Sequence, residues 1–242
     1  MMVEEKKISI LHTNDFHGKL GEVVLAKLRP FREAADLYFD CGDCVKAGNL
    51  AIPISPEVVW SRLAALNCTG SVPGNRESHI LESAFHRKME GAVHPILCAN
   101  MRDRKGELVL PESLILEVNN IRIGVFGVMV AMVTSKKATS SFSAFLWDAP
   151  IPAAERVVAS LRSQVDCVIA LTHIGLTQDR LLASKVSGID LILGGHSHNV
   201  LVSPERIQDT WIAQTGSHAR FAGTYVWTQG VGITSYQLSS LQ

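Results

Sequence analysis

Short apolar runs alternate with segments of helical spacing along the chain. Brief apolar runs bounded by glycine or polar residues predict buried strands, whereas apolar residues three and four apart predict amphipathic helices. Strands are predicted at residues 7–12, 37–40, 96–100, 113–119, 121–128, 166–171, 189–193, 211–214, 224–228 and 233–238. Helices are predicted at residues 23–32, 55–66, 78–89, 153–164 and 181–186. This alternation indicates a single α/β domain with two layers of sheet and helices outside them.

Local signals sharpen three of these segments. Ser55 is a candidate N-cap, with Pro56 at the first helical position. The pair Asn119-Asn120 between two apolar runs predicts a β-hairpin. The Ser-rich residues 136–145 are expected to form a mobile surface loop.

Composition and charge exclude several classes of protein. The chain has 242 residues, of which 47% are hydrophobic, and this supplies a buried core. Its 23 Lys and Arg residues balance 23 Asp and Glu residues, so no net charge attracts it to nucleic acid or to an anionic membrane. The most apolar uncharged run, residues 123–135, is shorter than the ~20 residues that cross a bilayer. Residues 1–7 contain no apolar signal core, and we expect a cytoplasmic protein.

The chain has five cysteines, an odd number that argues against a disulfide framework. Cys41 and Cys44 form a single Cys-x-x-Cys motif, and a zinc ribbon would need a second pair. Reduced, inert thiols are therefore the favoured interpretation, with a redox dithiol as the alternative.

Polar side chains that can bind a metal follow five of the apolar segments. They are Asp15, His17, Asp43, Asn75, His173, His196 and His198. Ligands of α/β sheets sit outside the carboxyl ends of the strands, so we expect these seven side chains to meet at one edge. Each motif alone is typical of a solvated turn, but the whole ordered set is far more specific.

The types of donor indicate the types of metal. Imidazole, carboxylate and amide donors without thiolate suit Mn²⁺, Fe²⁺ or Zn²⁺. Seven donors exceed the four of one tetrahedral zinc. Two divalent ions about 3.5–4 Å apart that share one carboxylate account for the number, and such a pair suits hydrolysis of a phosphate ester.

Five ordered motifs carry a family resemblance. The segments Leu11–Gly18, Gly42-Asp43, Gly74–Glu77, Leu171–Gly175 and Gly194–His198 resemble the calcineurin-like metallophosphoesterases, and within them the N-terminal metal-binding domain of 5′-nucleotidases. The resemblance implies a four-layer α/β/β/α sandwich with a dinuclear centre, in which a metal-bound hydroxide attacks phosphorus. It also implies one metallophosphoesterase domain over residues 1–242, without the C-terminal domain that gives nucleotidases their specificity.

The resemblance assigns a role to each of the seven donors. Asp15 and His17 would bind the first metal, and Asp43 would bridge both metals. The second metal would be held by Asn75, His173 and His196. His198 would complete the first site, at a position where nucleotidases often have glutamine.

Two positions depart from the family pattern. The family motif is Gly-Asn-His-Asp/Glu, and Arg76 replaces its catalytic histidine. His79 replaces the aspartate that orients that histidine. Arg76 cannot act as a general acid, but it can neutralise charge on a phosphoryl group. If a helix begins here, His79 shares its face and could donate the proton; alternatively, Arg76 pairs with Glu77 or another acid and His79 is merely exposed.

We therefore expect a metal-dependent hydrolase of small phosphorylated metabolites, with nucleotides among the candidates. The alternatives are a catalytically impaired relative that binds metal and phosphate, or a related hydrolase of another bond type, as in sulfur-oxidation thiohydrolases. No nucleic acid polymer and no membrane is expected as a partner. His218, beyond the last motif, could line the pocket, although a structural role is the favoured interpretation.

Overall fold

The computed structural model describes residues 5–242 and contains two large sheets. Residues 1–4, part of the segment in which the sequence shows no signal core, lie outside this range. The first sheet has the order β13-β12-β1-β2-β3. Its strands are β1 (Lys7–Thr13), β2 (Leu37–Asp40), β3 (Gly70–Ser71), β12 (Phe221–Thr228) and β13 (Gly232–Ser240). Strands β1, β2 and β3 are parallel, so their carboxyl ends meet at one edge.

The second sheet has the order β10-β11-β9-β8-β6-β5. Its strands are β5 (Ser113–Val118), β6 (Ile121–Met129), β8 (Cys167–His173), β9 (Leu191–Gly194), β10 (Glu205–Ile207) and β11 (Thr210–Gln214). Strands β6, β8, β9 and β11 are parallel. A small separate pair joins β4 (Met101–Arg102) to β7 (Leu146–Trp147).

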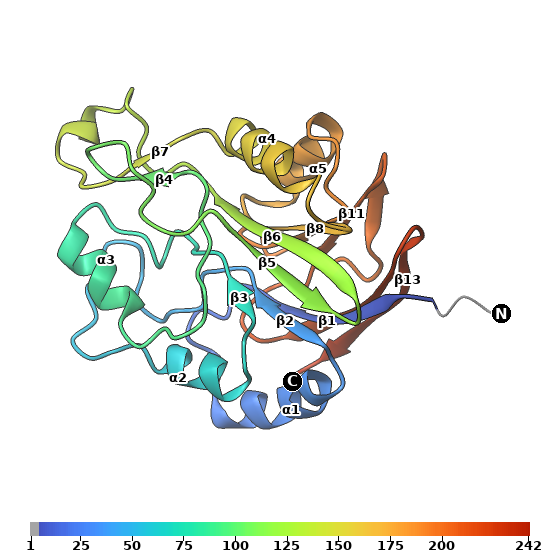
Figure 1. The fold of residues 1–242 in the computed structure, drawn as a ribbon. Coiled ribbons are helices and arrows are strands. Elements are labelled where there is room, and N and C mark those ends of the chain that lie inside the picture. The colour runs from blue at the N-terminus through green and yellow to red at the C-terminus, as the bar shows by residue number, and fades with distance from the viewer. Residues whose placement is uncertain (1–4) are drawn as a thin grey trace.

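Three buried clusters order the layers. One cluster joins residues of both sheets, such as Phe39 of β2 and Ile169 of β8, so the sheets pack face to face. A second packs α4 (Pro150–Leu161) and α5 (Leu176–Lys185) on the second sheet, and a third packs α1 (Glu22–Glu33) and α2 (Val58–Ala65) on the first. Figure 1 shows these helix pairs on opposite outer sides. The α/β class is confirmed, and the layers follow the order that the resemblance implies.

Four helices begin three or more residues away from the predicted start, and one of them is α4, which begins at Pro150 instead of residue 153. Helix α2 begins at Val58 with Glu57 as its N-cap, so the prediction of Ser55 as N-cap is wrong. Helix α3 (Glu82–Met89) also begins late, because the residues before it form turns and extended chain. Helix α5 begins at Leu176, earlier than predicted. The prediction missed its first turn because the buried residue Asp179 is polar and interrupts the apolar spacing.

The predicted strand at residues 96–100 is wrong as a regular strand. Its backbone N–H groups donate to three different segments: Leu97 to Ser71 of the first sheet (2.8 Å), Cys98 to Pro111 (2.8 Å) and Ala99 to Gly127 of the second sheet (2.7 Å). The segment is as buried as a strand, but it passes between the sheets instead of pairing along one neighbour.

The predicted hairpin is confirmed. Strands β5 and β6 pair antiparallel, and Asn119 and Asn120 both adopt positive φ (53° and 57°), as a type I′ turn requires. The Ser-rich loop contains a short 3₁₀ helix, Ala138–Ser141. Within residues 5–242, none of the helices has the length and apolar character needed to span a membrane.

Candidate metal centre

The loops that follow β1 and β2 run side by side and bring three carboxylate and imidazole donors together. The N–H of Asp15 donates to the carbonyl of Gly42 (2.9 Å), and the N–H of His17 donates to the carbonyl of Asp43 (2.8 Å). Both loops leave the carboxyl ends of adjacent parallel strands, which is where α/β sheets place their ligands. Backbone hydrogen bonds between these two loops therefore fix the relative positions of Asp15, His17 and Asp43.

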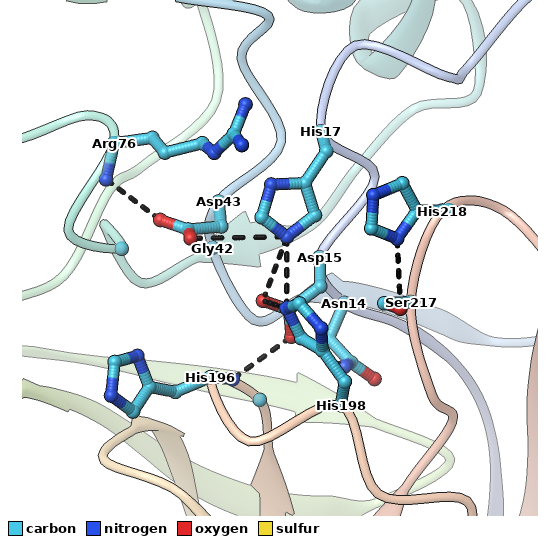
Figure 2. Close-up of polar contacts among 12 residues, drawn as sticks. Asn14, Asp15, His17, Gly42, Asp43, Arg76, His196, His198, Ser217 and His218 are labelled. Carbon is cyan, nitrogen blue, oxygen red and sulfur yellow. Dashed lines mark hydrogen bonds and ion pairs between the residues drawn. The ribbon is translucent and has the colours of Figure 1, made fainter. Parts of the chain in front are cut away.

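One group of donors converges beside Asp15. Its Oδ1 atom lies 3.4 Å from Nε2 of His17 and 3.2 Å from Nε2 of His198, and these two nitrogens are 3.0 Å apart. Figure 2 shows both imidazoles pointing at the carboxylate of Asp15. Two imidazole nitrogens and a carboxylate oxygen so close together offer three ligand atoms to one cation.

A second group converges beside Asn75. Its Oδ1 atom lies 2.9 Å from Nδ1 of His196 and 3.3 Å from Nε2 of His173. The same nitrogen of His173 lies 3.5 Å from Oδ1 of Asp43. These four residues come from the ends of β2, β3, β8 and β9, so distant parts of the chain meet here.

The carboxylate of Asp43 lies between the two groups. Its Oδ1 atom faces His173, whereas its Oδ2 atom lies 4.0 Å from Nε2 of His17. The structure thus brings all seven predicted ligands together, in two sets that share Asp43.

Unpaired polar atoms and a strained backbone fit a bound cation. Within residues 5–242, the buried Oδ1 atom of Asp15 has no hydrogen-bond partner. Five of the predicted ligands adopt positive φ, between 50° and 79°: Asp15, His17, Asp43, His196 and His198. Such backbone is costly for residues other than glycine and is concentrated at functional sites. Together with the nitrogen and oxygen donors, these features fit divalent ions.

Asp43 and His173 form a buried ion pair within the site. Burial disfavours a charged His173, but the carboxylate of Asp43 outweighs this effect and raises the pKa of His173 to about 10. Burial likewise opposes ionisation of Asp43, yet the charge of His173 lowers the pKa of Asp43 to about 2. The Nδ1 atom of His173 donates to the carbonyl of Cys41 (2.6 Å), which directs Nε2 toward the site.

Glu77 holds the loops together, a role that sequence analysis missed. Its buried carboxylate accepts the backbone N–H groups of Asp43 (2.8 Å), Val45 (3.0 Å) and Gly74 (2.8 Å). Among residues 5–242, the side chain of Arg76 donates to the carbonyl of Lys46 and not to Glu77 or another acid, so the hypothesis of such a pair is wrong.

Arg76 lies directly beside the shared carboxylate. Its backbone N–H donates to Oδ1 of Asp43 (2.7 Å), and its Nη1 atom donates to the carbonyl of Lys46 (3.2 Å). Figure 2 shows its side chain passing over Asp43 toward His17. A guanidinium has five N–H donors, so most of them stay free for a phosphoryl group.

His79 is buried rather than exposed, which corrects one alternative. Helix α3 begins only at Glu82, so the argument that His79 shares a helical face with Arg76 is also wrong. Its Nδ1 atom accepts the backbone N–H of Leu81 (2.9 Å), and burial, with the nearby ammonium of Lys88, lowers its pKa. A role of His79 as proton donor stays a prediction.

His218 reaches the centre although the sequence favoured a structural role. Its ring stacks on that of His17 with centroids 4.7 Å apart, and its backbone N–H donates to the carbonyl of Asp15 (2.7 Å). One nitrogen from each of His17, His198 and His218 lies within 4.8 Å of the others, so His218 is a further candidate ligand. The signal was its place after β11 in Gly216-Ser217-His218, which repeats the pattern of the other strand ends.

The two thiols nearest the site are placed for packing. Cys41 donates its S–H to the carbonyl of Leu193 (2.9 Å), whereas Cys44 donates to Glu77 (3.3 Å). Burial raises the pKa of both thiols well above the usual value, which makes them poor nucleophiles. The geometry therefore favours inert thiols over a redox dithiol.

Comparisons with known proteins agree with this geometry. The chain is 26% identical over 267 residues to the trifunctional nucleotide phosphoesterase protein YfkN of Bacillus subtilis (89% of this chain, 18% of that protein), and 28% identical over 222 residues to human 5′-nucleotidase (81% and 38%). It thus spans well under half the length of these relatives. The crystal structure of calcineurin-like phosphoesterase YfkN from Bacillus subtilis superposes with a TM-score of 0.80 at 20% identity, covering 98% of this chain and 91% of that one.

The crystal structure of a 5′-nucleotidase precursor from Thermus thermophilus has the same fold. It superposes with a TM-score of 0.78 at 20% identity, over 97% of this chain and 54% of that one. Residues 8–200 match the calcineurin-like phosphoesterases, so the five motifs identified the family correctly. The chain belongs to the calcineurin-like phosphoesterase family.

Proposed function

We propose that this protein is a phosphoesterase that holds two divalent ions and hydrolyses small phosphate monoesters. The observation that carries the proposal is the position of Asp43, whose two oxygens face two separate groups of donors. When bound, two such ions activate a water molecule and withdraw charge from the phosphoryl group. Asp15, His17 and His198 would hold the first ion, and Asn75, His173 and His196 the second, with Asp43 shared.

Arg76 takes the position of phosphate binder in this proposal. Its guanidinium lies at the rim of the centre, tied to the carbonyl of Lys46, where it can neutralise charge on the transferring group. It cannot protonate the leaving group. Esters with an acidic leaving group, such as aryl phosphates, should therefore react faster than alkyl esters, a class that includes nucleoside 5′-monophosphates.

The substrate class is proposed from the relatives. YfkN is named as a nucleotide phosphoesterase and the human relative as a 5′-nucleotidase, which makes nucleotides and similar small phosphorylated metabolites the first candidates. The metals are Mn²⁺, Zn²⁺ or Fe²⁺, because the site offers imidazole, carboxylate and amide donors.

Steady-state kinetics on an aryl and an alkyl phosphate, with added Mn²⁺, test the proposal. General acid assistance is worth about 10²–10⁴-fold, so the aryl ester should react faster by a factor within that range. Arg76→His should reduce the ratio of the aryl rate to the alkyl rate, because histidine can protonate a leaving group. Asp43→Asn should abolish phosphate release from both esters. Equal rates on the two esters would show that another acid is present.

The alternative is a relative that binds metal and phosphate but has lost turnover. It predicts bound metal and binding of a phosphate analogue with no hydrolysis of any ester. Both candidates keep the seven donors, so phosphate release from an ester is the result that decides between them.

A further inference from the structure

A closed loop at residues 46–57 joins β2 to α2 beside the metal centre. The carboxylate of Glu57, at its end, accepts the backbone N–H groups of Lys46 (3.1 Å) and Ala47 (2.8 Å), at its beginning. The loop thus returns on itself as one compact unit.

Helix α3 fastens the same loop. The fully buried Lys88 donates its Nζ to the carbonyls of Gly48 (2.9 Å) and Asn49 (3.0 Å), and also to the carbonyl of Arg76 (2.6 Å). Arg87 donates to the carbonyls of Pro53 (3.3 Å) and Ile54. Because these backbone carbonyls are held by two cations of one helix, the loop is pre-formed and is coupled to the turn that carries Arg76.

A cavity of about 630 Å³ lies between this loop, α2 and the segment that follows His17. That volume is typical of small-molecule sites. The loop lines it with apolar residues that include Ala51, Ile52 and Pro53, and α2 adds Val58, while Lys46 and Arg62 contribute polar groups. Ile52 and Val58 are more than half exposed, at 53% and 58%, so apolar surface there is open to a ligand.

The cavity lies beside the metal centre, because the carbonyl of its lining residue Lys46 accepts a hydrogen bond from Nη1 of Arg76 (3.2 Å). One wall includes Gly18, which directly follows His17, and another includes Lys46, three residues after Asp43. Gly18 and Lys46 are so close that a Cβ on Gly18 would lie 2.6 Å from the Cβ of Lys46. Three residues of chain span at most ~10 Å, so the part of the wall that Lys46 forms lies within that distance of Asp43, a distance that an aromatic leaving group on a bound phosphate can bridge.

We propose that this cavity binds the leaving group of the substrate, and that the preferred esters carry an extended apolar aromatic ring next to the phosphate. This proposal rests on the proposed function, which places the phosphate of the substrate at the metal centre. Its own basis is the pre-formed apolar wall of the 46–57 loop, tied through Lys88 to Arg76.

Naphthyl and phenyl phosphate test the proposal, because their leaving groups have nearly equal acidity and differ in apolar size. With Mn²⁺ present, kcat/KM for the naphthyl ester should be higher by roughly 10-fold, since the second ring fills an apolar pocket. Ile52→Asn should remove this preference while leaving phenyl phosphate nearly unchanged. The matched control is Val231→Asn, an equally exposed apolar residue (60%) in the β12–β13 turn.

Binding separates this proposal from the proposed function. Isothermal titration calorimetry with naphthyl phosphonate should show Kd rising about 10-fold in Ile52→Asn, with the Kd of inorganic phosphate unchanged. If no ester is hydrolysed but this difference in Kd is found, the cavity proposal stands and the phosphoesterase proposal fails. Equal kcat/KM for the two esters, or equal weakening of phosphonate and phosphate, would overturn the cavity proposal.

Discussion

His173 and Asp43 form a buried ion pair in the centre, with Nε2 of His173 lying 3.5 Å from Oδ1 of Asp43. In the metal-free protein the carboxylate of Asp43 outweighs the effect of burial and raises the pKa of His173 to about 10, so the imidazole is protonated at neutral pH. A metal ion binds the lone pair of the imidazole nitrogen, so His173 must lose its proton before it can act as a ligand. Metal binding and proton release are therefore linked at this one residue.

We expect that metal binding at pH 8 releases about one proton from His173. Calorimetric titration of the metal-free protein with Zn²⁺, in buffers of different ionisation enthalpy, measures this number directly. His173→Gln should remove the dependence on buffer, because glutamine has no proton to lose. Heats that are identical in all buffers for the wild type would contradict the prediction.

The sequence identified single ligands well and supporting residues poorly. Asp15, Asp43 and His173 stand at strand ends, where topology alone brings them together. Glu77 acts on the backbone N–H groups of other loops, and no pattern of side chains reveals such contacts. His218 was underestimated because it lies beyond the last family motif, although its position after a strand was the same signal.

At the scale of elements, two loops approach each other as closely as atoms allow. A Cβ built on Gly74 would lie 2.2 Å from Oδ1 of Asp43 and 2.4 Å from its backbone nitrogen. Contacts this short force one group to move, and here the group is the shared carboxylate. Position 74, in the turn after β3, therefore requires glycine, because any larger residue would displace the carboxylate of Asp43 in the loop after β2.

We expect Gly74→Ala to weaken metal binding by at least ~10-fold, because a displaced ligand loses its geometry. Gly21→Ala is the matched control, since a Cβ there meets nothing within 4 Å. Metal content after dialysis, with circular dichroism to verify folding, distinguishes the two variants. Equal metal content in Gly74→Ala and wild type would refute the close-contact argument.

Strands were easier to predict than helix starts, for a physical reason. Residues 37–40 are buried on both faces, so the apolar run has the same bounds as the strand in the structure. The residues before α2 and α3 have helical composition, but non-helical hydrogen bonds hold them out of helix. The carboxylate of Glu57 accepts the backbone N–H of Lys46, and Lys88 donates its Nζ to the carbonyl of Ser78. Such tertiary contacts override local propensity.

At the scale of the molecule, a buried carboxyl joins the outer helix α5 to the second sheet. Asp179 of α5 accepts hydrogen bonds from Thr172 of β8 (2.6 Å) and Gln214 of β11 (2.7 Å). Burial outweighs these hydrogen bonds and raises the pKa of Asp179 from 3.8 to about 7. The folded protein therefore holds this proton more tightly than the unfolded chain does.

A raised pKa in the folded state favours folding at low pH, and this contribution disappears as the pH rises through about 7. Between pH 5 and pH 8, we expect the free energy of unfolding of the wild type to fall by roughly 2–3 kcal/mol relative to that of Asp179→Asn. Urea denaturation of both proteins at several pH values measures this difference. Parallel stability curves would contradict the assignment.

The left-handed backbone of the ligand loops has a consequence for how such a chain changes over generations. Glycine or asparagine would occupy the positions of Asp15, His17, Asp43, His196 and His198 with less conformational cost. A lineage freed from any demand for catalysis would gain stability by drifting toward those residues. Charged and imidazole side chains still occupy all five places, as they would in a chain under continued selection for its chemistry.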